Sequence, residues 1–421
     1  MGAFVIRGCE IYLGGAFVPA ELEVRGGVVT ALGGGIVPGE GASVYNFKNC
    51  IVVPGLADVH VHLREPGFSY KETVASGTRA AARSGYAALC AMPNLSPVPE
   101  DAATLAQELD IIRRDAVIDV LPYGAITRGQ RGEQLADMSA MSPYVCGFSD
   151  DGRGVQPREL MRAAMLEAKR LGKPIAAHCE DNSLLRGGYI HDGEYAKAHG
   201  HRGICSESEW GPIARDIELL RETGCAYHVC HISTAESAAL IRSAKAEGLD
   251  ITCETAPHYL LLSDSDLQED GRFKMNPPLR SERDRLALIE ALRDGTIDIL
   301  ATDHAPHSAE EKSRGLAGSA FGITGLETAF PLLWTGLVEP GIITRERLVE
   351  LMSTAPARRF GIESGIEPGG PATFAVFETE TTYRIDPERF ASKGRATPFA
   401  GREVRGRCVL NVVRGREVWR A

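Results

Sequence analysis

The sequence predicts an α/β protein, a (β/α)8 barrel with a small β domain built from both ends of the chain. Short apolar runs alternate with amphipathic segments through the middle of the chain, and strand-like segments broken by glycine occupy both ends. The length of 421 residues suits one barrel plus a smaller unit. The predicted ranges are 1–53 and 365–421 for the small domain and 54–364 for the barrel.

The two ends of the chain share a β texture. The N-terminal part contains AFVIRGCEIYL, AFVPAELEVRGGVVTALGGG and SVYNFKNCIVVPG, and the C-terminal part contains PATFAVFE and CVLNVVRGREVW. Because chain termini often lie close in space, we expect these segments to form one domain together.

Eight apolar runs predict the barrel strands. They are ADVHVHL, YAALCAMP, IDVLPYGAI, YVCGFSD, PIAAHCE, AYHVCHIS, LDITCETAPHYLLL and IDILATDHAPH. Among the segments between them, residues 157–172 and 234–248 have helical spacing and end in glycine, a common stop signal. Thr234 is the expected N-cap of the second helix.

Composition narrows the classes of function. The chain is 44% hydrophobic and 24% charged, and no apolar run approaches the ~20 residues that span a bilayer. The first residues do not resemble an export signal, so we expect a cytoplasmic protein without a membrane anchor. A net charge of -10 disfavours nucleic acid as a partner. The ten cysteines, without a Cys-x-x-Cys, are expected to be small buried side chains in a reducing compartment.

A His-x-His pair gives the first chemical signal. His60 and His62 end the first apolar run, and alternation along a strand points both imidazoles to the same side, as a zinc site requires. Such a pair alone is often structural. Further donor side chains end other predicted strands: Asp151, His178, His231 and Asp303. Because barrel active sites gather at the carboxyl ends of the strands, the pattern predicts a shared metal site.

These residue types suit hydrolysis of an amide. Zinc held by imidazoles and carboxylates activates a water for attack. A carboxylate beside the metal then transfers the proton to the departing nitrogen, and Asp303 is the candidate. We assign none of His191, His199, His201, His228 and His258 to the metal, and we expect His228 to be a core histidine.

Several segments resemble the dihydroorotase family of the amidohydrolase superfamily. They are GLADVHVHLREPG, AMPN, KMNPPLR, ATDHAPH and FGITGLETAFPLL, and the resemblance runs over nearly the whole chain. It implies a distorted (β/α)8 TIM barrel of the metallo-dependent hydrolase type with a small β domain from both termini. The implied activity is reversible, zinc-dependent hydrolysis of (S)-dihydroorotate to N-carbamoyl-L-aspartate in de novo pyrimidine (UMP) biosynthesis.

The resemblance also assigns the metal ligands. It implies that His60, His62 and Asp303 hold one ion, that His178 and His231 hold a second, and that Asp151 bridges them. The fourth strand ends without the carboxylated lysine of many superfamily members, as in the dihydroorotases that carry an aspartate there. One or two zinc ions are therefore both open. The neighbouring Asp150 is expected to cap the following turn.

Substrate contacts follow from the same resemblance. Dihydroorotate carries a carboxylate, and Arg64 comes two residues after His62, so both side chains should share one face of the strand end. The residues implied to bind substrate are His62, Arg64, Asn94, Asn276, His307, Phe321 and Gly322. The glycine-containing loop at 309–320 is a hypothetical mobile lid.

Other readings remain open. A hydantoinase or allantoinase would share the ligands but does not need the carboxylate clamp of Arg64 and Asn94. A catalytically silent partner of aspartate transcarbamoylase would typically lose ligands, and this chain keeps all six. The resemblance is compatible with a homodimer and with a complex with aspartate transcarbamoylase.

Overall fold

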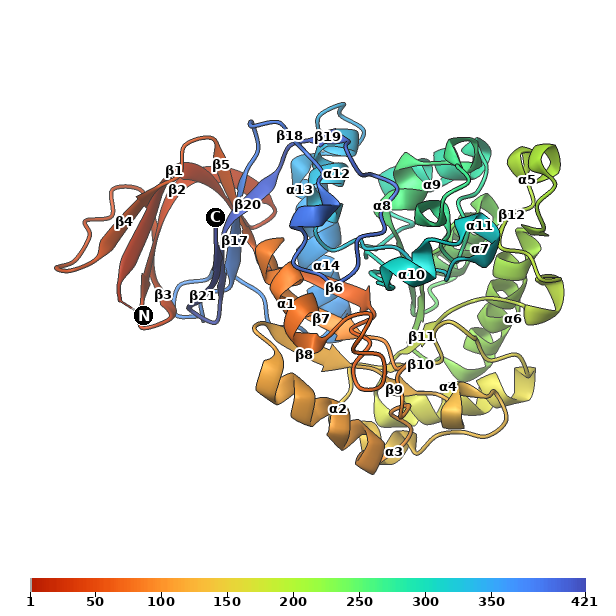
Figure 1. Ribbon diagram of the computed structural model, residues 1–421. Helices are drawn as coiled ribbons and strands as arrows, with labels where there is room; N and C mark the ends of the chain where they lie inside the picture. Colours follow the sequence, from red (N-terminus) through yellow and green to blue (C-terminus); the bar gives the residue numbers. More distant parts are fainter. Residues whose placement is uncertain (1) are drawn as a thin grey trace.

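The structure is a computed structural model that describes residues 2–421 (Figure 1). Residue 1, the first of the predicted range 1–53, lies outside the described residues. Within residues 2–421, no helix combines the length and the apolar character needed to cross a membrane. The ten cysteines are all free, and all except Cys205 are buried, as expected.

Strands from both ends of the chain form one sheet. Its order is β21-β20-β17-β5-β1-β2-β3, with β4 added on β1. The antiparallel pairing of β5 with β17 places Val52 opposite Val376 and so joins the two ends. The strands are β1 (Phe4–Leu13), β2 (Ala16–Arg25), β3 (Val28–Gly33), β4 (Ser43–Asn46), β5 (Cys50–Pro54), β17 (Phe374–Glu378), β20 (Arg407–Val413) and β21 (Arg416–Arg420).

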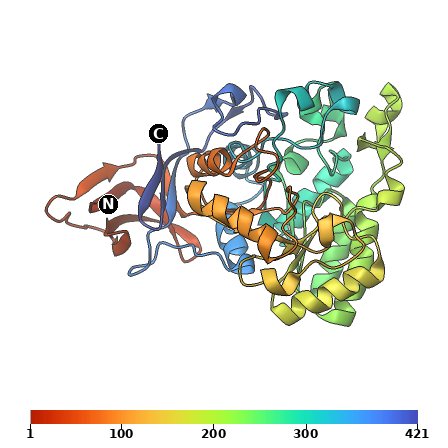
Figure 2. The ribbon, with the colours of Figure 1, turned by 60° about the horizontal axis from the view of Figure 1, so that its bottom comes forward.

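This sheet is the predicted small β domain. Figure 1 shows its red and dark blue strands side by side, outside the rest of the molecule, and the turned view in Figure 2 shows the same arrangement. The small domain from both termini is therefore confirmed. The boundaries at residues 53 and 365 stay a prediction, since β5 runs to Pro54 and β17 begins at Phe374.

Parallel strands in the middle of the chain form the barrel. They make two sheets, β6-β7-β8 and β16-β15-β14-β11-β10-β9, and a parallel bridge between Val61 and His304 brings the last strand back to the first. The strands are β6 (Leu56–Val61), β7 (Tyr86–Ala91), β8 (Asp119–Pro122), β9 (Gly124–Ala125), β10 (Phe148–Ser149), β11 (Ile175–Ala177), β14 (Tyr227–Val229), β15 (Ile251–Thr255) and β16 (Ile299–Leu300).

The barrel is distorted where the third predicted strand changes neighbours. Only Tyr123 separates β8 from β9. Its backbone N–H donates to Ala91 O at 2.9 Å, whereas the N–H of Gly124 donates to Gly147 O at 3.1 Å. The run 118–126 is thus one bent strand that links the two sheets, which gives the eight strands of the predicted TIM barrel.

Helices cover the outside of the barrel (Figure 2). The longer ones are α1 (Val74–Arg83), α2 (Ala102–Asp115), α4 (Arg158–Leu171), α6 (Glu207–Thr223), α7 (Ala235–Ala246) and α9 (Glu282–Arg293). The shorter ones are α3 (Met138–Met141), α5 (Glu194–His199), α8 (Pro257–Leu261), α10 (Ala309–Lys312), α11 (Gly315–Gly318), α12 (Ala329–Leu333), α13 (Arg345–Val349) and α14 (Ala355–Phe360). Two-residue strand pairs, β12 (Ile190–His191) with β13 (Gly203–Ile204) and β18 (Tyr383–Arg384) with β19 (Glu403–Val404), lie in the connections.

Both helices predicted above are present, as α4 and α7. The Thr234 hydroxyl accepts a hydrogen bond from Ser237 N at 3.2 Å, the expected N-cap of α7. Gly172 ends α4 at φ +66°, which an L side chain rarely adopts.

One strand prediction continued into a helix. The run LDITCETAPHYLLL is extended only to Thr255, and α8 begins at Pro257. Proline lacks an N–H and has a fixed φ, so it ends a ladder but suits the first turn of a helix.

Candidate metal centre and substrate cavity

Six donor side chains meet at the carboxyl end of the barrel strands. His60 lies in β6, and the others follow directly after a strand or within a few residues of it: His62, Asp151, His178, His231 and Asp303. All six residues are buried, with at most 6% of their surface exposed. The parallel order of the strands explains the meeting, since residues far apart in sequence leave the barrel at one face.

Asp151 lies at the middle of this cluster. Its Oδ1 is 3.3 Å from His60 Nε2, 3.5 Å from His178 Nδ1 and 3.6 Å from His231 Nε2. Its Oδ2 is 3.5 Å from His62 Nε2. One carboxylate therefore faces all four imidazoles, the position that a bridge between two ions would occupy.

Asp303 completes the other side of the cluster. Its Oδ1 lies 3.2 Å from His62 Nε2 and 3.5 Å from His60 Nε2. His60 belongs to three groups of donor atoms: one with His62 and Asp303, one with Asp151 and His231, and one with Cys230 and Glu254. Each group lies close enough together to hold a metal ion.

The unpaired atoms of the cluster fit a cation. His60 Nε2 and Asp151 Oδ1 are sealed from solvent, and neither has a hydrogen-bond partner within residues 2–421. The ring nitrogens His178 Nδ1 and His231 Nε2 are only 2.9 Å apart. Buried donors without partners are costly, and divalent metal binding is the usual explanation for imidazoles and carboxylates that converge in this way.

Glu254 orients the imidazole of His60 by a hydrogen bond, and the sequence analysis missed this residue. Nδ1 of His60 donates to Glu254 Oε1 at 2.6 Å, which leaves Nε2 directed at the cluster. The other oxygen accepts from Nε2 of the fully buried His228 at 3.0 Å, so His228 is a core histidine as expected. Burial acts to raise the pKa of Glu254, but His60 and His228 outweigh it and hold the pKa well below its usual value. The only sequence signal was a carboxylate inside an apolar strand.

The side chains of Asp150 and Asp151 have different partners. Asp150 Oδ1 accepts from the backbone N–H groups of Ile126 and Thr127 at 2.8 and 3.1 Å, so its side chain ties β10 to the end of β9. The expectation that Asp150 caps the following turn was wrong for the side chain. Its backbone carbonyl accepts from Arg153 and Gly154 instead.

A cavity of about 200 Å³ opens beside the cluster. All seven residues implied to bind substrate line it: His62, Arg64, Asn94, Asn276, His307, Phe321 and Gly322. Asp151, His178, His231 and Asp303 form part of the same wall. The structure therefore brings the predicted substrate residues and most of the predicted ligands to one small cavity.

Arg64 is the buried cation of this cavity. Its exposed fraction is 8%, and its Nε donates to Pro306 O at 3.3 Å. It has φ +61°, and His231 and Asp303 also have positive φ, at +34° and +46°. Non-glycine residues rarely adopt this region, and such strain is concentrated at functional sites.

Two asparagines connect the cavity to the cluster. Asn94 Oδ1 accepts from His62 Nδ1 at 2.8 Å, so Asn94 orients one predicted ligand. Asn276 Nδ2 donates to Glu180 Oε1 at 2.9 Å, whereas Asn276 Oδ1 is buried and has no partner within the described chain. Glu180 also lies 3.4 Å from His178 Nε2, and the sequence analysis missed this residue.

The Phe321–Gly322 wall is already hydrogen-bonded within the protein. Phe321 O accepts from His307 Nε2 at 2.7 Å, and Gly322 N donates to Lys274 O at 3.1 Å. Gly322 has φ +129°, and a Cβ there would lie 2.5 Å from Ala305 O. Glycine is thus required by both the backbone conformation and the close packing.

The fold is similar to that of solved cyclic-amide hydrolases. L-hydantoinase (dihydropyrimidinase) from Arthrobacter aurescens superimposes with a TM-score of 0.87 at 25% identity, over 100% of this chain and 96% of that one. A dihydropyrimidinase from Brevibacillus agri gives 0.86 at 22% identity, over 99% and 95%, and shows the fold alone. The barrel and the His/Asp cluster define the class: the chain has the fold and the donor cluster of an amidohydrolase.

Sequence comparisons identify the family within this class. Residues 49–237 match the "Dihydro-orotase-like" family model. The dihydroorotase of Geobacillus kaustophilus is 47% identical over 423 residues, and that of Bacillus caldolyticus 46% over 422, each covering 100% of this chain and 99% of the relative. The chain belongs to the dihydroorotase family.

Proposed function

We propose that the chain catalyses the reversible hydrolysis of (S)-dihydroorotate to N-carbamoyl-L-aspartate, a step of de novo pyrimidine biosynthesis, and that it uses zinc. The observation that carries the proposal is the position of Arg64, a buried cation in the same 200 Å³ cavity as the His/Asp cluster. A cyclic amide with a carboxylate needs both features side by side. Relatives 46–47% identical over the full chain support the same activity.

The six clustered side chains are the proposed zinc ligands. His60, His62 and Asp303 would hold one ion, and His178 and His231 a second, with Asp151 between them. The short contacts of Asp151 with four imidazoles support the bridging role. Imidazole and carboxylate ligands favour zinc, and either one or two ions are compatible with this donor set.

Asp303 is the proposed general acid and base. Bound zinc would supply Lewis-acid activation of the amide carbonyl and of a water. Asp303 would take the proton of the attacking water and return it to the ring nitrogen that leaves. Its place beside both the ligands and the cavity supports this role, because a base must reach the proton that it takes.

The remaining cavity residues are the proposed substrate contacts. Arg64 would bind the carboxylate together with Asn94, and the unpaired Oδ1 of Asn276 suits a ring N–H. Burial, followed by the charges of Arg64 and Lys71, lowers the pKa of His307 to about 3. His307 is then neutral at physiological pH, and its Nε2–H is bound to Phe321 O. Phe321 and Gly322 would form the wall against the ring.

A hydantoinase activity is the second candidate, because the similar solved structures include hydantoinases. Purified enzyme would be assayed with dihydroorotate, hydantoin and allantoin at equal concentrations. We expect kcat/KM for dihydroorotate to exceed the other two by roughly 10²-fold or more, since only dihydroorotate pairs with the Arg64 cation. Faster turnover of hydantoin or allantoin would overturn the assignment.

We further propose that the chain forms a homodimer in the cytoplasm and that it associates with aspartate transcarbamoylase. The ten free cysteines support a reducing compartment. Light scattering of the purified protein, alone and mixed with aspartate transcarbamoylase, tests both assemblies. A monomeric mass under both conditions would reject both assemblies. Turnover of dihydroorotate would reject the alternative of a catalytically silent scaffold.

A further inference from the structure

Lys312 is a buried cation that the proposed chemistry does not use. It ends α10 and has only 7% of its surface exposed. Its Nζ donates to three backbone carbonyls: Lys274 O at 3.0 Å, Ala320 O at 2.8 Å and Gly322 O at 2.7 Å. An ammonium group has three N–H donors, and here each one has an acceptor.

The three carbonyls belong to the two segments that form the wall of the substrate cavity. Ala320 and Gly322 flank Phe321, and Lys274 lies two residues before Asn276. The same two segments are joined by the hydrogen bond from Gly322 N to Lys274 O. Lys312 therefore joins the two segments that carry the cavity-lining residues Asn276, Phe321 and Gly322.

The burial of this lysine has a physical cost. Loss of water is the largest effect and lowers the pKa of Lys312 to about 7; Lys274 acts in the same direction, while Asp270 and Glu311 oppose it. A long cationic side chain is rarely buried without a carboxylate partner. Here backbone carbonyls replace the carboxylate, and each belongs to a residue that lines the cavity or lies within two residues of one that does.

We propose that Lys312 is a positioning residue for the substrate, holding the Ala320–Gly322 and Lys274–Asn276 segments at the spacing that the ring of a cyclic amide requires. Lys312 does not line the cavity, so it acts through these segments and not by contact with substrate. The inference rests on the proposed function, since it takes this cavity as the substrate site.

The test compares Lys312→Met and Lys312→Arg with the wild type in steady-state assays of dihydroorotate hydrolysis. Lys312→Met keeps the volume of the stem and removes the donors. We expect KM to rise by roughly 10²-fold, with kcat changed much less, because a displaced wall weakens binding of ground and transition state alike. Lys312→Arg keeps the charge, but its planar group cannot direct three donors from one nitrogen. Its KM should therefore lie between those of the wild type and Lys312→Met.

Two further measurements separate positioning from general damage. The zinc content of each variant should equal that of the wild type, and amide exchange should become faster in residues 313–325 but not in α4. Lys197→Met is the matched control, because Lys197 is an exposed lysine on α5. It should leave KM, kcat and exchange unchanged.

The possible outcomes are distinct. A wild type that does not hydrolyse dihydroorotate would reject the proposed function itself. With an active wild type, a KM of Lys312→Met within twofold of normal, or a loss that follows zinc content, would overturn the role of Lys312. An arginine variant no better than the methionine variant would also overturn it. If Lys312→Met does not fold, Lys312→Arg decides: higher KM at normal zinc content supports the inference, and an unchanged KM rejects it.

Discussion

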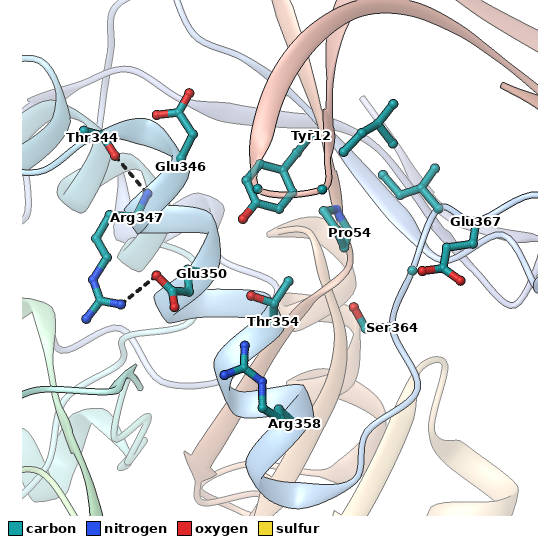
Figure 3. Close-up of a pocket in the computed structure, with 15 residues that line it drawn as sticks. Tyr12, Pro54, Thr344, Glu346, Arg347, Glu350, Thr354, Arg358, Ser364 and Glu367 are labelled. Atoms are coloured by element: carbon teal, nitrogen blue, oxygen red, sulfur yellow. Dashed lines mark hydrogen bonds and ion pairs between the residues drawn. The ribbon is translucent and has the colours of Figure 1, made fainter. Parts of the chain in front are cut away.

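Two of the cavities in the molecule differ strongly in character. The cavity at the carboxyl end of the barrel strands measures about 200 Å³, and another, between the terminal β sheet and α13–α14, measures about 650 Å³. Figure 3 shows the larger one, with Tyr12, Arg347, Glu350, Thr354 and Arg358 around it. Pro54, just before β6, also lines it, so it lies at the opposite end of that strand from His60 and His62.

The difference between them lies in how their polar groups are satisfied. Around the larger cavity, Arg347 pairs with Glu350 at 2.7 Å, and Arg358 is exposed to solvent. Around the smaller cavity, His60, Asp151 and Asn276 each keep a buried atom without a partner within residues 2–421. Buried unpaired atoms are costly and are retained where a ligand or metal supplies the missing partner. The smaller cavity thus differs from the larger one in that unpaired buried atoms converge beside it, and this convergence, not volume, supports it as the proposed active site.

The largest expected effect comes from Asp303→Asn. The substitution keeps the shape of the side chain but removes the proposed acid and base, so kcat should fall by roughly 10²- to 10⁴-fold. Steady-state kinetics with zinc content measured on the same sample would show it. Asp250→Asn, at an exposed aspartate before the amino end of β15, is the control. Near-normal turnover of Asp303→Asn would reject the role.

Arg64→Met should have the next largest effect. Removing a buried, charge-assisted contact weakens binding of dihydroorotate by up to ~3 kcal/mol, which is roughly 10²-fold in affinity. Hydantoin has no carboxylate, so any turnover of hydantoin should change far less. KM measured for both substrates tests the clamp. An unchanged KM for dihydroorotate would contradict it.

Glu254→Gln should weaken zinc binding by about 10- to 100-fold, because an amide holds the imidazole of His60 less firmly than a carboxylate does. Competition with a chromophoric chelator measures the affinity. Glu108→Gln, at another buried glutamate on α2, should bind zinc as the wild type does. Equal zinc affinity in Glu254→Gln and the wild type would reject the role of Glu254 in orienting His60.

The smallest expected effect belongs to the larger cavity. Arg358→Met alters the wall of that cavity and should leave kcat and KM for dihydroorotate within about twofold of normal, since surface substitutions usually change stability by no more than ~0.5 kcal/mol. The same assay as for Arg64→Met provides a matched comparison of two arginines. A large loss of activity in Arg358→Met would mean that the two cavities are energetically coupled.

The sequence could predict that the donor side chains cluster, but it could not predict which other residues hold them and the cavity wall in place. His62, His178, His231 and Asp303 follow strands, and parallel strands deliver their ends to one face, so the cluster follows from the order of elements. The partners of Glu254 and Lys312 depend on packing between distant segments, which no local pattern records. Positive φ at Arg64 is equally invisible in the sequence. Pro257, in contrast, is a local signal in the sequence, and from it one could have predicted that the strand ends before this residue.

Removal and return of zinc tests the central claim most directly. The purified protein would be treated with a chelator, dialysed, and assayed for dihydroorotate turnover before and after addition of zinc, with the bound metal counted at each stage. We expect activity to disappear with the metal and to return with one or two zinc ions per chain in the wild type, but to remain low in zinc-loaded Asp303→Asn. Full activity in metal-free protein, or a zinc-loaded wild type that does not hydrolyse dihydroorotate, would contradict the proposed zinc-dependent activity.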